Sequence, residues 1–258
     1  YKINREQRRE IFMKSLQDKV AIITGASRGI GAEIAKAIAQ AGASVIINYA
    51  NNRSAADLIV SEIKKLGGNA IPVRADVSNS VEVKALFDAA ITHFGKIDIL
   101  INNAGTAIFK SIQDTSDEEL DRIFAINVKG TFYCLREAAT RLSNGGRIIN
   151  ISSSVTRLIL PTYGAYAATK GAVEQLTRVF AKEMGSRGIT VNSISPGPTN
   201  TELFLEGKSK ETIQRLAAMS AFGRIGETED IAKVVLFLAS EGAAWVTGQN
   251  IGVNGGVA

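Results

Sequence analysis

The sequence predicts an α/β protein built on one doubly wound, seven-stranded parallel sheet with helices on both faces. The first observation is that short runs rich in β-branched residues alternate with longer segments of helical period from residue 19 onward. The second is that no Pro- or Ser-rich linker divides the 258 residues. The third is the composition, 45% hydrophobic and 21% charged, which is typical of a globular chain with a sizeable core.

Seven short apolar runs are expected to form strands, because each is rich in Val, Ile or other strand-forming residues. They cover residues 20–24, 44–48, 70–75, 97–101, 147–152, 190–194 and 250–253. The segments between them carry apolar residues at helical spacing and predict helices over 30–41, 54–66, 81–94, 117–142, 163–186 and 229–239. Ser116 and Glu119 have the spacing of a capping box, which would satisfy free backbone N–H groups at the start of helix 117–142.

The counts of cysteine, histidine and charge exclude several classes of protein. A lone Cys134 cannot form an intrachain disulfide or a thiolate zinc cluster, and we expect it in the core. One imidazole, His93, is too few for the usual metal sites and is expected as a cation near the end of its helix. The basic residues behind the net charge of +5 are scattered, which argues against nucleic acid, and no run of about 20 apolar residues predicts a membrane span. A reducing compartment, the cytoplasm, is the expected location.

The first twelve residues differ in character from the rest of the chain. They contain four basic and two acidic groups, so they supply +2 of the net charge of +5. Because Met13 directly precedes the first strand-like run, we expect residues 1–12 to be a tag or another non-native extension. Residues 13–258 are then expected to form a single domain.

A glycine-rich turn joins the first predicted strand to the first helix. It reads Gly25-x-x-x-Gly29-x-Gly31. Glycines in such a turn let the backbone approach a pyrophosphate, and the following helix start supplies free N–H groups and a positive dipole end. Three glycines alone are weak evidence, but their place between a strand and a helix at the head of an alternating chain predicts a dinucleotide site.

The charges near this turn indicate which dinucleotide binds. NAD sites usually carry an acidic residue at the end of the second strand, but residues 48–53 (Asn-Tyr-Ala-Asn-Asn-Arg) contain none. Arg28 lies inside the glycine turn, and a guanidinium attracts a 2′-phosphate. Arg53 is an equally good candidate for phosphate contact and for a solvated residue at a helix start. The pattern therefore favours NADP(H) over NAD(H).

A tyrosine and a lysine four residues apart predict an acid–base pair on one helix face. They are Tyr166 and Lys170. A phenol has a pKa near 10, and a nearby ammonium favours the phenolate and brings the group toward its working range. Ser153 stands thirteen residues earlier, at the end of a predicted central strand, where parallel sheets place their ligands.

Taken together, these features resemble the short-chain dehydrogenase/reductase family across residues 19–256. The motifs that carry the resemblance are Thr24-Gly25-x-x-x-Gly29-x-Gly31, Asn102-Asn103-Ala104-Gly105, Asn127 in Ile126-Asn127-Val128, Ser153, Tyr166-x-x-x-Lys170 and Pro196-Gly197-x-x-x-Thr201. The resemblance implies a Rossmann-type fold and an NADP-dependent oxidoreductase that acts on CH–OH or C=O groups of a small molecule.

The resemblance also implies the roles of four catalytic residues. Tyr166 would protonate the carbonyl oxygen, and Ser153 would orient that carbonyl. Lys170 would lower the phenol pKa and bind the nicotinamide ribose. Asn127 would hold a water that connects Lys170 to solvent.

The cofactor would contact residues from the ends of several strands. The resemblance implies adenine contact by Asp76 and Val77, ribose contact by Asn103, and nicotinamide contact by Thr201 with residues 194–197. The full expected set is Gly25, Ser27, Arg28, Gly29, Ile30, Gly31, Asn48, Tyr49, Ala50, Asn51, Asp76, Val77, Asn103, Ala104, Gly105, Tyr166, Lys170, Pro196, Gly197, Thr199 and Thr201.

A lid over residues 198–222 is expected to close the substrate site. The residues expected to line a mainly apolar pocket are Leu158, Ile159, Leu160, Pro161, Leu203, Phe204 and Leu205, and no charged group is placed to demand a carboxylate or phosphate. An aldehyde and ketone reductase of broad specificity is favoured. The alternative is a 3-oxoacyl-[acyl-carrier-protein] reductase, for which Arg187 matches one basic position but Asn144 departs from the second. An inactive NADP-binding sensor is disfavoured because the catalytic set is complete.

Small residues on the Tyr166 helix suggest close packing against another helix. They are Ala167, Ala168, Gly171 and Ala172. They pack on the chain's own sheet or on a second subunit, and the resemblance implies a homotetramer, or a homodimer, with this helix and the preceding long helix at interfaces.

Overall fold

The computed structural model describes residues 15–258 and contains the predicted seven-stranded parallel sheet. The strand order is β3-β2-β1-β4-β5-β6-β7, so the order reverses between β1 and β4. Such a reversal opens a crevice at the carboxyl ends of the strands, where doubly wound sheets bind ligands. The strands are β1 (Val20–Ile23), β2 (Ser44–Tyr49), β3 (Asn69–Arg74), β4 (Ile99–Asn102), β5 (Arg147–Ile151), β6 (Thr190–Pro196) and β7 (Asn250–Val253).

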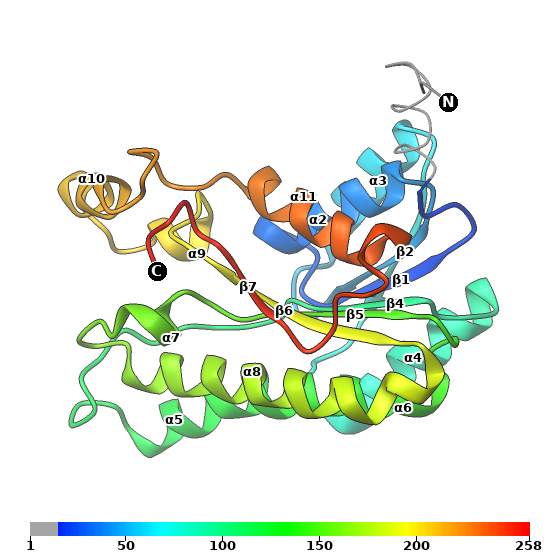
Figure 1. Cartoon of the computed structure of the whole chain (residues 1–258), viewed down its shortest axis with the longest axis horizontal. Coiled ribbons are helices and arrows are strands. Elements are labelled where there is room, and N and C mark those ends of the chain that lie inside the picture. The colour runs from blue at the N-terminus through cyan, green and yellow to red at the C-terminus, as the bar shows by residue number, and fades with distance from the viewer. Residues whose placement is uncertain (1–14) are drawn as a thin grey trace.

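Helices cover both faces of the sheet (Figure 1). One layer consists of α2 (Gly29–Gln40), α3 (Arg53–Lys65) and α11 (Thr228–Ala239). The opposite layer consists of α4 (Ser80–Phe94), α6 (Gly130–Arg141) and α8 (Gly164–Met184), with α5 (Asp117–Phe124) packed against α8. The two layers enclose two separate apolar cores.

Alternation along β1 shows why the central strands are apolar throughout. Ala21 and Ile23 belong to the core under α2 and α11, whereas Ile22 belongs to the core under α4 and α6. All three side chains are fully buried. A parallel strand covered on both faces must present apolar groups in both directions, so its sequence reads as a continuous apolar run.

The predicted helix 117–142 is interrupted. It consists of α5, a π-helical turn η1 (Ala125–Lys129) and α6. The predicted capping box is present, because Ser116 and Glu119 exchange side-chain to backbone hydrogen bonds of 3.1 and 3.3 Å. The π turn contains Asn127, and π turns inside helices are frequent at functional sites.

The segments that follow β5 and β6 gather at one end of the sheet, the left end in Figure 1. They are the short α7 (Val155–Leu158) after β5, and α9 (Glu202–Leu205) and α10 (Lys210–Ala218) after β6. The predicted lid is therefore two short helices joined by a loop. Two single 3-10 turns, η2 (Gly185–Arg187) and η3 (Glu241–Ala243), complete the elements.

The expected extension 1–12 lies outside the described residues, as does Met13. Within residues 15–258, no helix is both long enough and apolar enough to cross a bilayer. The same residues contain no cluster of His, Cys, Asp and Glu side chains suited to a metal ion. Cys134 is in the core, as predicted, and burial raises the pKa of its thiol to about 12.

Candidate active site

The turn between β1 and α2 needs glycine at three positions. Gly25 and Gly29 have φ angles of +62° and +56°, a region that side chains disfavour. A Cβ on Gly31 would lie 2.4 Å from Nδ2 of Asn103 and 2.6 Å from the carbonyl oxygen of Gly25. The backbone of this turn is therefore packed directly against the loop that follows β4.

Asn48, at the end of β2, fixes the turn from inside the protein. Its Oδ1 accepts a hydrogen bond of 3.2 Å from the N–H of Gly25. Its amide nitrogen donates to the carbonyl oxygens of Val73 and Ala75 at 3.3 and 3.0 Å. Because the side chain is 1% exposed and fully engaged, Asn48 supports the expected cofactor site by holding the turn in place rather than by reaching outward.

Thr24 and Asn103 join the turn to β4. Oγ1 of Thr24 accepts hydrogen bonds of 3.0 Å from the N–H groups of Asn103 and Ala104. The Asn103 amide donates to the carbonyl oxygens of Thr24 and Gly25 at 2.9 and 3.0 Å. The bracing role of Thr24 emerges only from the structure, although a hydroxyl residue directly before the glycine turn is a signal that the sequence contains. The Asn103 side chain, expected at the cofactor ribose, is used to brace the turn.

The start of α2 offers a binding site for an anion. Arg28 is the N-cap residue and makes no side-chain cap, and the first turn contains no acidic residue. The first N–H groups of a helix are free of intrahelical partners and lie at its positive dipole end, so they suit a phosphate group. α2 thus fits the pyrophosphate that the glycine pattern predicts.

The lid reaches this turn. Nη1 of Arg28 lies 3.1 Å from Oε2 of Glu202 in α9, and the two side chains are 69% and 78% exposed. A Cβ on Gly29 would lie 3.6 Å from Cγ2 of Thr201, the residue that caps α9. Arg28, expected at the cofactor phosphate, is therefore within reach of a carboxylate of the lid.

The end of β2 carries no carboxylate, as the sequence indicated. Asn52 caps α3 by accepting a 3.0 Å hydrogen bond from the N–H of Ala55. Arg53 begins α3 and lies 3.2 Å from Asp57, one turn further on, which raises the pKa of the guanidinium. Arg53 is exposed at the start of the helix, and its contact with a cofactor phosphate stays a prediction.

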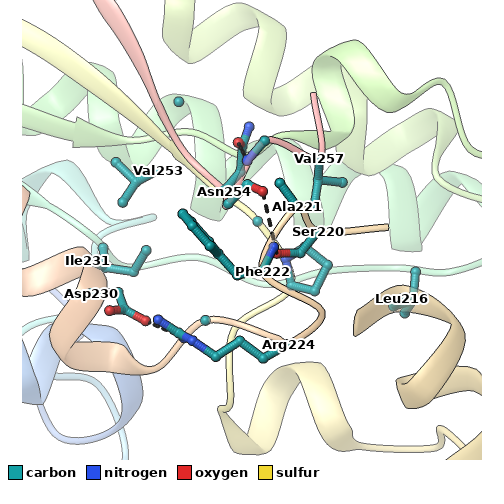
Figure 2. Close-up of a pocket in the computed structure, with 16 residues that line it drawn as sticks. Leu216, Ser220, Ala221, Phe222, Arg224, Asp230, Ile231, Val253, Asn254 and Val257 are labelled. Atoms are coloured by element: carbon teal, nitrogen blue, oxygen red, sulfur yellow. Dashed lines mark hydrogen bonds and ion pairs between the residues drawn. The ribbon is translucent and has the colours of Figure 1, made fainter. Parts of the chain in front are cut away.

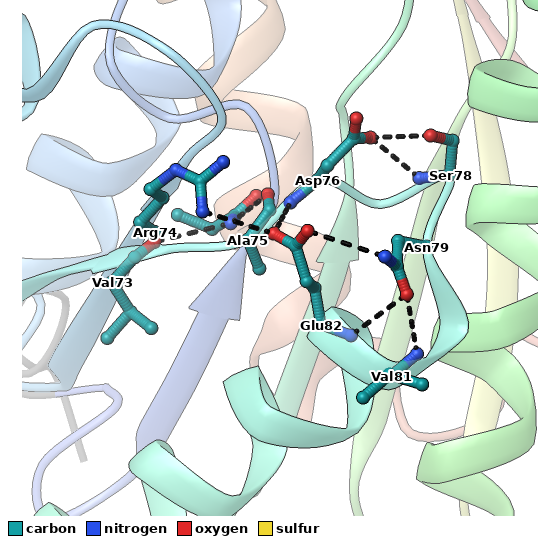
Figure 3. A network of polar contacts seen from close by, with 9 residues as sticks. Val73, Arg74, Ala75, Asp76, Ser78, Asn79, Val81 and Glu82 are labelled. Carbon is teal, nitrogen blue, oxygen red and sulfur yellow. Dashed lines mark hydrogen bonds and ion pairs between the residues drawn. The ribbon is translucent and has the colours of Figure 1, made fainter.

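Figure 3 shows the loop after β3, where the adenine is expected. The carboxylate of Asp76 accepts hydrogen bonds from the N–H and the hydroxyl of Ser78 at 2.9 and 2.7 Å. The N–H of Asp76 donates to Glu82 at 2.9 Å, and Asn79 caps α4. Val77 is buried in the core, so its backbone, not its side chain, is what this loop offers to a ligand.

Ser153, Tyr166 and Lys170 converge at the carboxyl end of β5. Ser153 follows the strand by two residues, and Tyr166 and Lys170 lie in the first two turns of α8. Nζ of Lys170 donates to the carbonyl oxygen of Ile151 at 2.8 Å and lies 5.7 Å from the centre of the Tyr166 ring. The structure brings together the three side chains that the sequence selected.

Burial has the largest effect on the protonation of Tyr166 and Lys170. Burial raises the pKa of Tyr166 to about 12, while its hydrogen bond with Ser153 acts in the opposite direction. Burial lowers the pKa of Lys170 from 10.5 to about 8. Burial is the dominant effect on the phenol in this state of the protein, and the expectation that Lys170 lowers the phenol pKa stays a prediction.

Asn127 links the loop after β4 to α8. Its amide oxygen and nitrogen both bond to the backbone of Thr106 at 2.9 Å, and its nitrogen also donates to Oγ1 of Thr169 at 3.0 Å. Thr169 directly precedes Lys170, so this contact fixes the turn of α8 that carries the lysine. The predicted role as a water carrier stays a prediction.

Glu174 supports the segment that carries Ser153. Its Oε1 accepts hydrogen bonds from the hydroxyls of Ser152 and Thr156 at 2.9 and 2.8 Å, one on each side of Ser153. The sequence contains no sign of this contact, because Glu174 reads as one more polar residue on a helix. The carboxylate thereby ties the β5–α7 connection to α8.

A cavity of about 440 Å³ lies at the base of the lid (Figure 2). It is bounded by the α10–α11 connection and by the chain after β7, and it shares Gly197 with the expected nicotinamide site. Ser153, Tyr166 and Lys170, the expected catalytic residues, are not part of its wall. It is therefore a neighbour of the catalytic site and not the place where the carbonyl is expected.

Arg187 is engaged inside the chain. Its Nε donates to Oδ1 of Asn144 at 2.9 Å, and its Nη1 donates to the carbonyl oxygen of Ala139 at 2.5 Å, with a further hydrogen bond to the carbonyl of Leu142. The guanidinium therefore satisfies carbonyl groups at the C-terminal end of α6. The residue that matched a carrier-protein contact has a structural role here.

The fold, the glycine turn and the Ser153–Tyr166–Lys170 group define an oxidoreductase. A family model described as enoyl-(acyl carrier protein) reductase matches residues 25–258. A protein of Arabidopsis thaliana described as an NADPH-dependent aldehyde reductase-like protein, chloroplastic, is 46% identical over 255 residues, covering 93% of this chain and 94% of that protein. The chain belongs to the short-chain dehydrogenase/reductase family.

Solved structures agree with this family and its fold. A short-chain dehydrogenase/reductase from Serratia marcescens has a TM-score of 0.91 and 37% identity, covering 94% of this chain and 99% of that one. The angucycline C-6 ketoreductase LanV with bound NADP has a TM-score of 0.89 and 40% identity, covering 94% of this chain and 96% of that one. The phosphorylated cofactor that the charge pattern predicts accords with these descriptions.

We expect Gly31→Ala to weaken NADPH binding by roughly tenfold, because the new Cβ would push the glycine turn away from Asn103. Fluorescence titration with NADPH measures this, and urea unfolding should show a loss of about 1–3 kcal/mol. Gly185→Ala is the matched control, since its φ is −58° and no atom lies within 4 Å of the added carbon. Unchanged NADPH affinity in Gly31→Ala would contradict the close packing of the glycine turn against Asn103.

Proposed function

We propose that this protein is an NADPH-dependent reductase of aldehydes or ketones, with Tyr166 as the general acid and with alcohol oxidation as the reverse reaction. The observation that carries the proposal is the convergence of Ser153, Tyr166 and Lys170 at the carboxyl end of β5, two strands from the glycine turn. The descriptions of two similar proteins, an aldehyde reductase-like protein and a ketoreductase, support it.

The residues around the turn fit a phosphorylated dinucleotide. The backbone cradle admits no side chain at Gly31, and α2 begins without an acidic residue. The pair between Arg28 and Glu202 is highly exposed, and exposed pairs contribute little, so a 2′-phosphate can replace the carboxylate at Arg28. When bound, NADPH supplies the hydride that adds to the carbonyl carbon.

The chain's own residues handle the proton. With a pKa of about 12, Tyr166 keeps its proton at neutral pH and donates it to the carbonyl oxygen. The Ser153 hydroxyl donates a hydrogen bond to the same oxygen. The Lys170 ammonium, 5.7 Å from the phenol ring, stabilises the phenolate that forms, an interaction stronger in the transition state than in the ground state.

The alternative is reduction of 3-oxoacyl groups on an acyl carrier protein. The family model's description names an acyl carrier protein, which favours it. The engagement of Arg187 with α6 and the neutral Asn144 weigh against it, because an acidic carrier protein is bound by available cations. A sensor without activity is the weakest alternative, since all four expected catalytic side chains are present.

The protein is further proposed to act in the cytoplasm as a homotetramer. The single buried Cys134 suits a reducing compartment. Exposed apolar residues on the two helices expected at interfaces, Phe132 of α6 at 47% and Val179 of α8 at 57%, suit contact with a second copy of the chain.

Tyr166→Phe is expected to lower kcat for carbonyl-dependent NADPH oxidation by about 10²–10⁴-fold, because it removes the donated proton and little else. NADPH binding should be nearly unchanged. Tyr163→Phe is the control, since this ring is a neighbour on the same face of α8 and has no assigned proton transfer. Turnover at the wild-type rate by Tyr166→Phe would refute the mechanism.

Reduction is expected to decline as pH rises through about 8. The pKa of Lys170 is lowered, so its ammonium is present below about 8 and lost above, whereas Tyr166 stays protonated until about 12. The profile of kcat/KM for NADPH, which reports the free enzyme, measures this. Lys170→Arg keeps its charge and should lack the decline near pH 8, while a wild-type profile flat to pH 10 would contradict the assignment.

Light scattering coupled to size exclusion is expected to give a mass four times that of the chain, or twice it for a dimer. Val179→Glu should lower the mass, because it places a carboxylate at an exposed apolar position of the helix expected at the interface. A monomer at micromolar concentration in the unmodified protein would refute the assembly.

A further inference from the structure

A lysine of the lid lies between two aromatic rings beside the catalytic residues. Nζ of Lys208, in the loop between α9 and α10, is 4.5 Å from the ring centre of Phe109 and 4.9 Å from that of Phe204. Phe109 comes from the loop after β4, whereas Phe204 belongs to α9. Two distant parts of the chain thus contribute one ring each to the same ammonium. We call Lys208, Phe109 and Phe204 the lid cluster.

Phe109 connects the lid cluster to the site of proton transfer. Its ring centre is 4.8 Å from that of Tyr163 and 6.5 Å from that of Tyr166, with the second pair edge to face. The Phe109 side chain is 41% exposed, so one part of the ring is available for contact. Phe109 therefore lies between Tyr166 and the Lys208 ammonium. A molecule whose carbonyl lies at Tyr166 would extend along the Phe109 ring toward that ammonium.

Within the described part of the chain, the Lys208 ammonium forms no ion pair with a carboxylate. None of the ion pairs among residues 15–258 involves Lys208. Partial burial lowers the pKa of Lys208, and the nearby Glu206 raises it by less. Aromatic faces attract a cation weakly compared with a carboxylate, so this ammonium is able to pair with an anionic group of a ligand. Its long flexible stem lets it turn from the rings to that group.

We propose that Lys208 is a substrate-binding residue that gives the enzyme a preference for flat aromatic carbonyl compounds bearing a carboxylate. The ring of the substrate stacks on Phe109 and Phe204, and its carboxylate pairs with the Lys208 ammonium. This proposal rests on the proposed carbonyl reduction. It differs from the expectation that no charged group is placed to demand a carboxylate, because the fold brings the Lys208 ammonium beside Phe109.

The test compares two substrates that share a benzaldehyde ring. 4-Carboxybenzaldehyde carries the anion, and methyl 4-formylbenzoate is its neutral counterpart. We expect Lys208→Met to raise KM for 4-carboxybenzaldehyde roughly fivefold to tenfold, as for the loss of one partly exposed ion pair. Its kcat for this substrate, and both constants for the ester, should be nearly unchanged. Lys210 is an exposed cation at the start of α10, so Lys210→Met is the matched control and should leave KM unchanged for both substrates. The carboxylate preference should also weaken with added salt.

An equal loss on both substrates in Lys208→Met would overturn the proposal, because Lys208 would then only hold the lid. A second variant, Phe109→Leu, tests the aromatic part. It should reduce the preference for benzaldehyde over cyclohexanecarbaldehyde, and an unchanged preference contradicts stacking at this position.

Binding of 4-(hydroxymethyl)benzoate, measured by calorimetry with NADP⁺ present, separates this proposal from the proposed function. If the protein reduces no aldehyde but binds this compound and loses the binding in Lys208→Met, the reductase assignment fails and the anion site stands. If it reduces aldehydes but Lys208→Met binds the compound as tightly as the unmodified protein, the reductase assignment stands and the anion site fails.

Discussion

The close packing of the β1–α2 turn against the loop after β4 is the constraint on which the rest of the site depends. No side chain fits at Gly31, where a Cβ would lie 2.4 Å from Asn103. Asn48 from β2 and Thr24 from the end of β1 hold the same turn with hydrogen bonds from two directions. Because three strands fix one backbone segment, the free N–H groups of α2 have a fixed position relative to the end of β5. The separation between the phosphate site and Tyr166 is thereby set by the sheet, not by flexible side chains.

Sequence patterns predict the parts of this protein that depend on local rules. The seven strands and the helices around them follow from apolar runs and periodicity, and most ends are correct within two residues. The grouping of Ser153, Tyr166 and Lys170 follows from their spacing and from the place of Ser153 after a central strand. The reversal of strand order between β1 and β4 does not follow from such local rules, because it depends on which strands pair across long stretches of chain.

Features that depend on tertiary contacts are not visible in the sequence. The π turn at Asn127 interrupts a pattern that reads as one helix, and the hydrogen bonds of the Asn127 side chain reach Thr106 and Thr169 on other elements. Glu174 supports the Ser153 segment only because α8 crosses the end of β5. The same holds for Lys208, which reads as an ordinary lysine in a loop until the fold brings Phe109 beneath it.

The electrostatics of the site follow from burial more than from pairing. A buried phenol and a buried ammonium each favour their neutral forms, so the pKa of Tyr166 rises while that of Lys170 falls. In the proposed reaction this state suits proton donation by Tyr166, and the Lys170 ammonium would stabilise the phenolate once the phenol has released its proton. Cations at the two ends of the lid region complete the arrangement: Arg28 lies against Glu202 of α9, and Lys208 lies against aromatic rings. Since each contact is weak and each cation can turn to a stronger anion, a phosphorylated cofactor and a carboxylate substrate would act on opposite ends of the same short lid. Both of these contacts of the lid would thus be exchanged for contacts with ligands.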